Sequence, residues 1–297
     1  MAAAASDSLN LGCAAAVDVG DLPVLLRRDQ SGVVSAWLNI CAHRSAPVFA
    51  GEARPCDRFR CPYHGWTYGP DGRLIRSPMF GGDPGDQSLT RLEVREAFGA
   101  IWVADSLEPS FGTVFAGLMA AGAPEAKDWH ARREVSHALA CSWDVYVENY
   151  LEAYHIPFIH PGLSRDLDVS AYQVEVHDGF VVHRVPPEPD SVVAGFWAWV
   201  WPNTMLNVYG SGMNIERVRP AGDGKCVIDY TYIFDPGASD DAVERAVAQS
   251  GEVTAEDRDI CERVQRNLET GRAKQGPLSP VHEQGIVAFR AWQSGQV

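Results

Sequence analysis

Two short segments decide the fold of this 297-residue chain: CAHR at residues 41–44 and CPYHGW at residues 61–66. One residue separates Cys41 from His43, two separate Cys61 from His64, and 17 residues lie between the two pairs. Each pair brings two ligand atoms together without straining the backbone, as a metal centre built on two loops requires. A Cys₂His₂ zinc site pairs cysteine with cysteine and histidine with histidine, so the alternating order argues against zinc.

The alternating order suits a [2Fe–2S] cluster in which Cys41 and Cys61 hold one iron and His43 and His64 hold the other. Here the sequence resembles the Rieske family, and the HGW continuation resembles its oxygenase branch. Neither loop contains the additional disulfide-forming cysteine of respiratory Rieske proteins. Cys56, between the loops, is interpreted as a small buried hydrophobic residue rather than a ligand.

Composition and charge agree with a folded enzyme of one large or two moderate domains. Hydrophobic residues make up 46% and charged residues 22%, as in globular proteins. The net charge of -14 disfavours nucleic acid and anionic membranes as partners. No apolar run reaches the ~20 residues that span a bilayer, and the alanine-rich start lacks the basic residues of a targeting signal. Seven cysteines, an odd number, favour the reducing cytoplasm.

The predicted fold class is α+β, with an N-terminal all-β domain at residues 1–106 and a catalytic domain at residues 107–297. Short strands between turn signals are expected from about 24 to 103, and a helical junction from 106 to 126. Strand patterns then dominate as far as Phe234, and a long helix is expected at about 238–271. The resemblance implies a Rieske domain followed by a helix-grip domain, in which an antiparallel sheet folds around a long C-terminal helix.

A second set of candidate ligands lies in ENYLEAYHIPFIHP, residues 148–161. Glu152 and His155 are three residues apart and are expected on one face of a helix. Pro157 is expected to end that helix, so that the turn brings His160 back toward His155. Two histidines and a distant carboxylate form the facial triad that binds Fe(II). The segment resembles the catalytic helix of Rieske oxygenases, which implies that His155 and His160 bind a mononuclear iron and that Glu152 bridges the two metal centres.

The third ligand is expected in EDRDICERVQRNL, residues 256–268, which resembles the C-terminal helix of the same family. An apolar stripe on this helix is formed by Val253, Ile260, Val264 and Leu268. Asp257 lies within about 20° of the centre of the stripe, whereas Asp259 lies roughly opposite, among charged residues. A carboxylate in an apolar core is costly unless it is paired or binds metal. We therefore predict Asp257 as the ligand and Glu256 as a solvated or supporting group.

The resemblance extends from about residue 24 to residue 289 and is greatest to the branch of choline, carnitine and glycine-betaine oxygenases. It implies O₂-dependent hydroxylation of a small organic substrate, including oxidative N-demethylation of a quaternary amine. It also implies electrons from NAD(P)H through a separate reductase or ferredoxin, and a homotrimer with Glu152 at the subunit interface. Relatives have several dozen more residues before the first Rieske cysteine, so either a misassigned start codon or a trimmed Rieske domain with weaker trimer contacts is expected.

Trp197, Trp199 and Trp201 alternate in FWAWVW, residues 196–201, and are expected on one face of a strand. They either line a cavity for a cationic group or pack against the C-terminal helix.

Alternatives to amine oxidation are an aromatic-ring dihydroxylating dioxygenase, an O-demethylase, a Rieske electron-transfer protein and a non-catalytic binding protein of the same fold. The long second domain, with its own ligand set, argues against a pure electron carrier.

Overall fold

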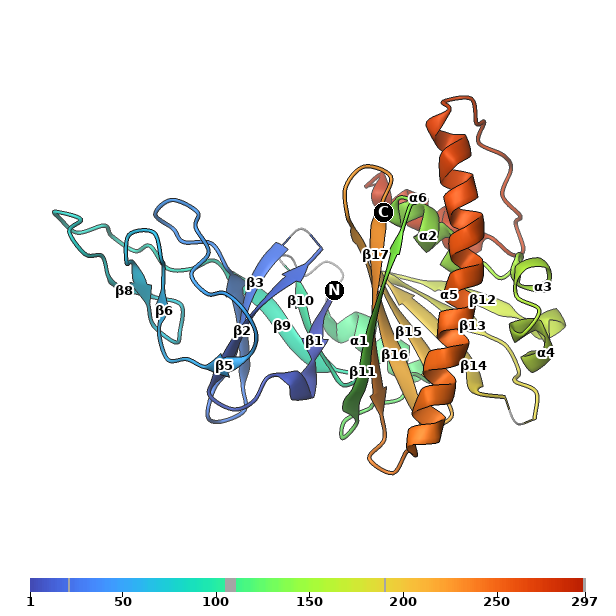
Figure 1. The fold of residues 1–297 in the computed structure, drawn as a ribbon, viewed down its shortest axis with the longest axis horizontal. Coiled ribbons are helices and arrows are strands. Elements are labelled where there is room, and N and C mark those ends of the chain that lie inside the picture. Colours follow the sequence, from blue (N-terminus) through green and yellow to red (C-terminus); the bar gives the residue numbers. More distant parts are fainter. Residues whose placement is uncertain (21, 105–110, 190, 296–297) are drawn as a thin grey trace. The chain divides into compact units, whose positions relative to one another are not determined.

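The structure is a computed structural model that describes residues 1–20, 22–104, 111–189 and 191–295. It divides the chain into two compact units, Met1–Glu108 and Pro109–Val297, each of which is described by itself (Figure 1). The boundary expected between residues 106 and 107 falls outside the described residues. Among the helices in these ranges, none is both long and apolar enough to cross a membrane.

The first unit consists of antiparallel strands in two sheets. The larger sheet has the strand order β1-β10-β9-β4-β3-β2-β5, and the smaller one has the order β6-β7-β8. The elements of this unit are β1 (Ala2–Ala5), η1 (Ser6–Ser8), β2 (Cys13–Val19), β3 (Leu22–Arg28), β4 (Val34–Leu38), β5 (Arg54–Pro55), β6 (Phe59–Arg60), β7 (Thr67–Tyr68), β8 (Leu74–Arg76), β9 (Arg91–Ala97) and β10 (Ala100–Ala104).

Strands β1 and β2 extend the all-β unit to the alanine-rich start of the chain, where the sequence analysis expected no strand. Alanine favours helices when it is isolated. Here Ala2 pairs with Trp102 and Ala5 with Ala100, so β1 forms an edge strand of the sheet. Both alanines are only 2% exposed, which suits a small side chain packed beside large ones. Tertiary pairing therefore overrides the local preference.

The second unit contains a seven-stranded antiparallel sheet with the order β11-β17-β16-β15-β14-β13-β12. Its first strand therefore pairs with its last, and the other strands follow one another as hairpins. The elements are α1 (Phe111–Ala120), β11 (His130–Leu139), α2 (Trp143–Tyr150), α3 (Ile156–Ile159), α4 (Leu163–Asp166), η2 (Val169–Ala171), β12 (Gln173–His177), β13 (Phe180–Arg184), β14 (Val193–Val200), β15 (Thr204–Tyr209), β16 (Gly212–Pro220), β17 (Cys226–Phe234), α5 (Asp240–Glu269) and α6 (Gln284–Gln293).

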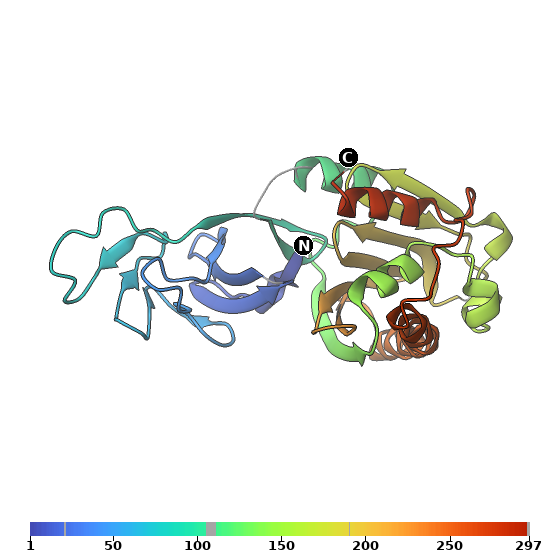
Figure 2. The same cartoon turned by 90° about the horizontal axis from the view of Figure 1, so that it is seen from above.

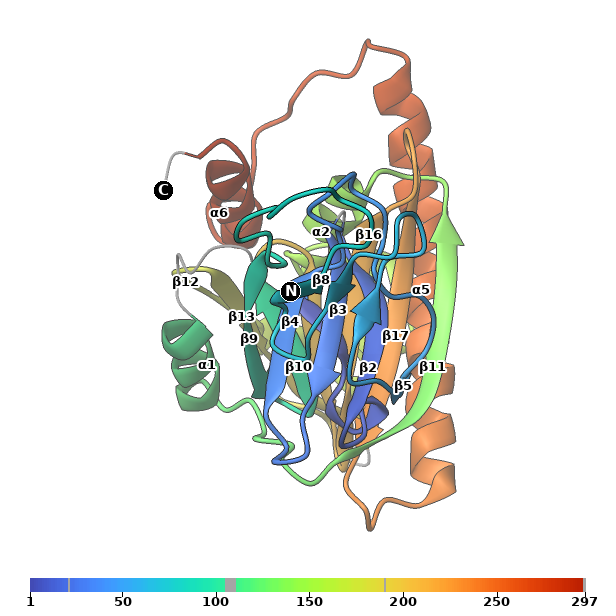
Figure 3. The same cartoon turned by 90° about the vertical axis from the view of Figure 1, so that its left-hand side faces the viewer.

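Three helices cover the sheet and define the space in which the second site lies. Seen from above, α2 lies between α5, which is viewed along its axis, and α6 (Figure 2). Helix α5 packs near β11 and β17, and α6 packs near β12 at the other edge of the sheet (Figure 3). This arrangement places α2 and α5, the two helices expected to contribute ligands, against each other.

Helix α5 begins and ends with recognisable signals. The Ser239 side chain accepts a hydrogen bond from the backbone N–H of Ala242, and Asp240 and Asp241 occupy the first turn, where the helix dipole favours acids. Gly271, with φ of 65°, follows the last turn. The expected helix at 238–271 is therefore confirmed within two residues at each end.

The expected α+β class, with an all-β Rieske domain and a helix-grip domain, is confirmed. Of the helix expected from 106 to 126, residues 111–120 form α1, residues 121–126 are not helical, and residues 106–110 lie outside the described residues. Helix α6 was not expected. Its Phe289 is fully buried against Trp143, Trp199 and Trp201.

Candidate metal centres

The two Cys/His loops of the first unit have the same backbone geometry. The N–H of Cys41 donates to the carbonyl of Ala46 at 2.8 Å, and the N–H of Ser45 donates to the carbonyl of Cys41 at 3.0 Å. In the second loop, Cys61 N–H donates to Trp66 at 2.8 Å, and Gly65 N–H donates to Cys61 at 3.1 Å. The fifth residue of each loop has positive φ, 57° for Ser45 and 72° for Gly65. Two similar turns thus present one cysteine and one histidine each.

The four predicted cluster residues lie together. Cys41 and Cys61 are each 2% exposed in the core beneath the loops. The rings of His43 and His64 have centroids 4.6 Å apart, and the buried Nδ1 of His43 has no hydrogen-bond partner within the described part of the chain. Two buried thiols and two adjacent imidazoles, one with an orphaned nitrogen, fit a [2Fe–2S] cluster with mixed ligands. Their individual roles as ligands remain predictions.

Two aromatic residues support these loops. The hydroxyl of Tyr68 accepts a hydrogen bond from the N–H of Ala42 at 3.0 Å and lies 3.2 Å from the Sγ of Cys41, to which it can donate. Trp66 stacks on His43 with centroids 4.7 Å apart. Cys56 is a free, half-buried thiol whose Sγ donates to the carbonyl of Arg58, in line with its interpretation as no ligand.

In the second unit, the geometry around Pro157 differs from the expected one. Helix α2 ends at Tyr150, so Glu152 and His155 lie in the turn that follows it rather than on one continuous helix. Pro157 lies in the first turn of α3 and therefore helps to begin a helix, because proline has the helical φ and needs no N–H there. His155 and His160 flank α3 on either side, and this four-residue helix brings their rings to a centroid distance of 5.0 Å.

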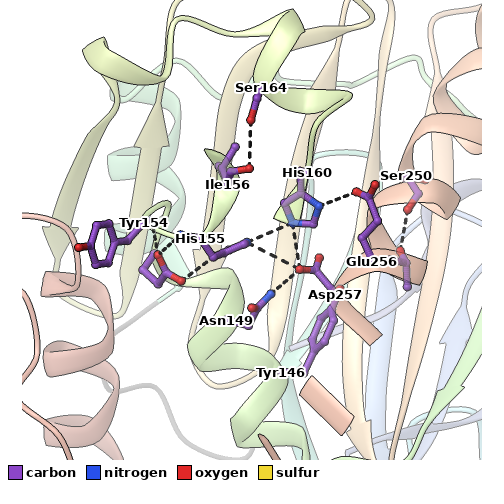
Figure 4. A network of polar contacts seen from close by, with 12 residues as sticks. Tyr146, Asn149, Tyr154, His155, Ile156, His160, Ser164, Ser250, Glu256 and Asp257 are labelled. Atoms are coloured by element: carbon purple, nitrogen blue, oxygen red, sulfur yellow. Dashed lines mark hydrogen bonds and ion pairs between the residues drawn. The ribbon is translucent and has the colours of Figure 1, made fainter. Parts of the chain in front are cut away.

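His155, His160 and Asp257 converge on one point (Figure 4). The two Nε2 atoms are 3.1 Å apart, and Oδ1 of Asp257 lies 3.0 Å from His160 Nε2 and 3.7 Å from His155 Nε2. Ligands about 2.1 Å from an ion at right angles lie ~3 Å apart, so the three atoms fit the facial arrangement of a two-histidine, one-carboxylate iron site. The structure thus brings together the three residues predicted as ligands, and their metal binding remains a prediction.

The remaining ring nitrogens of both histidines are held by carboxylates. Nδ1 of His155 lies 2.6 Å from Glu152, and Nδ1 of His160 lies 2.7 Å from Glu256. Burial lowers the pKa of His160, but the carboxylates of Asp257 and Glu256 outweigh this and hold it above its ordinary value. Each carboxylate fixes the tautomer that directs Nε2 toward the common point. Glu256 is therefore a supporting group, one of the two roles expected for it.

Asp257 and Asp259 have different surroundings on α5. Asp257 is 6% exposed and accepts a hydrogen bond from Asn149 at 2.7 Å, whereas Asp259 is exposed and pairs with Arg263. The apolar stripe used to choose between them was partly wrong, because Val264 and Leu268 are exposed. The buried face of α5 is formed by Val243, Ala246, Thr254, Asp257, Cys261 and Gln265.

A cavity of about 100 Å³ opens beside the three converging residues. Tyrosine and tryptophan side chains form part of its wall: Tyr146, Tyr150, Tyr172, Trp197, Tyr209 and Tyr230. Of the three tryptophans in FWAWVW, Trp197 lines this cavity, while Trp199 and Trp201 pack on Phe289 and Trp292 of α6. Trp197 thus lines a cavity, as one alternative expected, whereas the helix that Trp199 and Trp201 contact is α6 and not the long C-terminal helix named in the other alternative.

The sequence analysis missed two titratable residues of the cavity. Glu216 on β16 is 2% exposed and accepts hydrogen bonds from the hydroxyl of Tyr146 at 2.7 Å and the amide of Asn207 at 3.0 Å. Burial raises the pKa of Glu216 to about 7. His183 on β13 is fully buried, and burial lowers its pKa to about 3, so its imidazole is neutral. The only sequence signal was the polar pair Asn214 and Glu216 on one face of a central strand.

Comparison with known families agrees with both sites. Residues 1–85 match the family described as the Rieske [2Fe–2S] domain, and residues 126–296 match the ring hydroxylating alpha subunit (catalytic domain). The chain belongs to the alpha subunits of the Rieske ring-hydroxylating oxygenases, a family of oxidoreductases that contain a [2Fe–2S] cluster and a mononuclear non-haem iron.

Particular relatives narrow the family further. Choline monooxygenase of Beta vulgaris is 32% identical over 298 residues, which cover 92% of this chain and 66% of the relative. The oxygenase subunit of carnitine monooxygenase of Escherichia coli K12 is 26% identical, covering 90% of this chain and 78% of the relative. The chain spans about two thirds of the length of the choline monooxygenases that it matches.

Solved structures share the fold over 99% of this chain. The quaternary ammonium Rieske monooxygenase CntA in complex with L-carnitine has a TM-score of 0.80 at 22% identity, covering 88% of that chain. Naphthalene 1,2-dioxygenase with indole bound has a TM-score of 0.77 at 16% identity, covering 86% of that chain. At these identities the likeness concerns the fold alone.

Proposed function

We propose that this chain is the oxygenase component that hydroxylates a small quaternary amine, at an N-methyl group or at a neighbouring carbon. The observation that carries the proposal is the convergence of His155, His160 and Asp257 beside an aromatic cavity. The relatives named choline and carnitine monooxygenases support the amine class. When bound, the mononuclear iron activates O₂, and the [2Fe–2S] cluster supplies electrons that a separate reductase or ferredoxin takes from NAD(P)H.

The chain's own residues have distinct tasks in this proposal. His155, His160 and Asp257 bind the mononuclear iron, and Glu152 and Glu256 orient the two imidazoles. Cys41, His43, Cys61 and His64 bind the cluster. The aromatic wall of the cavity excludes water and holds the cationic head of the substrate by cation–π attraction.

Assembly and compartment belong to the same proposal. We infer a homotrimer in which Glu152 lies between the iron site of one subunit and the cluster of the next. A structure of the related quaternary ammonium monooxygenase is described in terms of inter-subunit electron transfer, which supports this inference. The seven free thiols support a reducing compartment, the cytoplasm. Light scattering of the purified protein tests the trimer, and a monomer at micromolar concentration would contradict it.

Oxygen consumption tests the proposed activity. The protein, purified anaerobically and supplied with NADH and a reductase from another Rieske oxygenase, should consume O₂ when choline is added, and the products should include formaldehyde or an aldehyde of the amine. Asp257→Ala should abolish the consumption, whereas Asp259→Ala should retain it. Consumption with naphthalene but with no amine would favour the ring-dihydroxylating alternative. Reversible cluster reduction without any O₂ uptake would favour the electron carrier.

A further inference from the structure

We propose that Glu216 is the charge-selecting residue of the cavity, so that the site takes a monocationic amine and rejects zwitterionic amines with a carboxylate. This inference rests on the proposed amine-oxidising function and refines its substrate class. Glu216 lies on β16, in the sheet that forms the floor of the cavity, and accepts hydrogen bonds from Tyr146 and Asn207, which are not among the three predicted iron ligands. It is therefore available for recognition.

The first argument is the charge of the cavity wall. Its described lining residues include three carboxylates, Glu152, Glu216 and Asp257, and neither lysine nor arginine. Above pH 7, where Glu216 is ionised, these three carboxylates and a bound Fe²⁺ together leave one negative charge. Among the lining histidines, His183 is buried and neutral. One positive charge on the substrate balances this wall, whereas an added carboxylate would have no cationic partner.

A neighbouring cavity does not supply the missing cation. It is lined in part by Arg165, together with the acids Asp166, Glu252 and Glu256. Three carboxylates against one guanidinium leave this second cavity negative as well. A carboxylate that extended from the first cavity into the second would therefore meet net repulsion.

The second argument is the way Glu216 is held. Tyr146 and Asn207 donate one hydrogen bond to each of its oxygens. A carboxylate has about four acceptor positions, so these two bonds, with Tyr230 as a third hydrogen-bond partner, fix its direction without saturating it. Three of the surrounding tyrosine hydroxyls form hydrogen bonds within the protein: Tyr150 donates to Asn207, Tyr230 bonds Thr254 and Tyr209 accepts from Asn214. The rings of these tyrosines can therefore contact an alkylammonium group, while the oriented carboxylate of Glu216 supplies the negative charge beside it.

Calorimetric binding at pH 8.5, where Glu216 is ionised, to the anaerobic protein with both metal centres tests the inference without turnover. Three ligands of similar size differ in charge: choline is a cation, glycine betaine is a zwitterion with a carboxylate in place of the hydroxymethyl group, and 3,3-dimethylbutan-1-ol is the uncharged carbon isostere of choline. Choline should bind at least ~10-fold more tightly than the other two, as expected for one unscreened charge pair at several ångströms. Equal binding of choline and its isostere, or tighter binding of betaine, would overturn the proposal without any variant.

Substitution identifies the residue. Glu216→Gln should weaken choline binding by about 10- to 100-fold and leave the binding of the isostere unchanged. The matched control is Glu134→Gln, an exposed acid on β11 that does not line the cavity; it should bind all three ligands as the parent does. Retained isostere binding shows that the Glu216 variant is folded. If that variant binds choline as tightly as the parent, the inference is wrong. If the Glu216 variant also loses isostere binding, it gives no information on charge selection. The ratio of choline affinity to isostere affinity in the parent then decides whether the inference holds.

The same ligands separate this inference from the proposed function. Charge-dependent choline binding without O₂ consumption in the presence of reductase would contradict the activity and leave the charge selection intact. Rapid oxidation of betaine with tight binding would contradict the charge selection and leave amine oxidation intact. Binding of naphthalene alone would contradict both.

Discussion

Each histidine of the second site has one ring nitrogen on a carboxylate and directs the other toward Asp257. The spacing of Glu152 and His155 was readable from the sequence, and so was the buried position of Asp257. The partner of His160, Glu256, was not predictable as such, because it depends on the packing of α3 against a helix about a hundred residues later. The periodicity of a sequence identifies the buried face of a helix, but it does not identify which residue of another element contacts that face.

The choice between Asp257 and Asp259 leads to the first prediction. Asp257→Ala should remove the mononuclear iron while the absorption spectrum of the Rieske cluster persists, so that iron falls from about three to about two per chain. Asp259→Ala removes only an exposed pair with Arg263 and should keep all of the iron. Metal analysis of both variants after identical reconstitution decides the point, and loss of iron from the Asp259 variant alone would refute the assignment.

Glu256 is predicted to strengthen iron binding although it is no ligand. Glu256→Ala removes the acceptor of His160 Nδ1 and should lower the affinity for iron by about 10- to 100-fold. Glu252→Ala, one turn earlier on the same helix, is the matched control, because Glu252 contacts no histidine of the site. Competition with a chelator measures both affinities. Equal affinities in the two variants would mean that Glu256 is only a surface acid.

The raised pKa of Glu216 predicts a pH effect on stability. The groups that face it are Tyr146 from α2, Tyr230 from β17 and, across the cavity, Asp257 from α5. Its pKa is about 7 in the folded protein against an ordinary value of 4.5, so the folded state holds its proton more tightly. The resulting stability is present below pH 4.5 and is lost as the pH rises through 7.

Glu216→Gln removes this dependence. Between pH 5.5 and pH 8 the free energy of unfolding of the parent should therefore fall by about 2 kcal/mol relative to that of the variant. Urea unfolding of both proteins, after a chelator has removed the mononuclear iron, measures the difference. A constant difference across this range would show that Glu216 has an ordinary pKa.

At the scale of elements, the sequence predicted the type of most strands and of α5, since their patterns are long and periodic. The sequence prediction was wrong where the buried face of a helix contains both polar and apolar residues. The buried face of α5 includes Thr254, Asp257 and Gln265, because it faces a polar cavity as well as the core. An apolar stripe is therefore an incomplete guide to the inner face of a helix that lines a site.

Helix α6 was missed because it is short, but its packing predicts a large contribution to stability. Phe289→Ala empties a fully buried position between Trp143, Trp199 and Trp201, and should cost about 3–5 kcal/mol. Val287→Ala on the same helix, at a side chain 55% exposed, should change stability by less than ~0.5 kcal/mol. Tryptophan fluorescence during urea unfolding reports on both. Equal midpoints would show that α6 does not belong to the cooperative core.

At the scale of the whole molecule, the two predicted sets of metal ligands lie in separate units, and the proposed turnover requires electrons to pass between the two metal centres. The order of the two units was predictable, because each has its own motif. The assembly was not, since subunit contacts leave no periodic pattern in a single sequence. Glu152 bears both on the geometry of the iron site and on the proposed assembly. It holds His155 Nδ1, and its side chain is 11% exposed.

Glu152 either orients a histidine or also relays electrons, and a comparison with Glu256 separates the two. Both acids bond the Nδ1 of a site histidine, so Glu152→Gln and Glu256→Gln should perturb orientation alike. If Glu152 is also the bridge, only its variant should slow re-oxidation of the chemically reduced cluster by O₂ and substrate, by ~10-fold or more, a barrier change of about 1.4 kcal/mol. Stopped-flow absorbance, at iron occupancies matched by metal analysis, measures this rate. If both variants slow the re-oxidation of the cluster equally, Glu152 only orients His155. If the rate is unchanged in both, neither acid takes part in electron transfer.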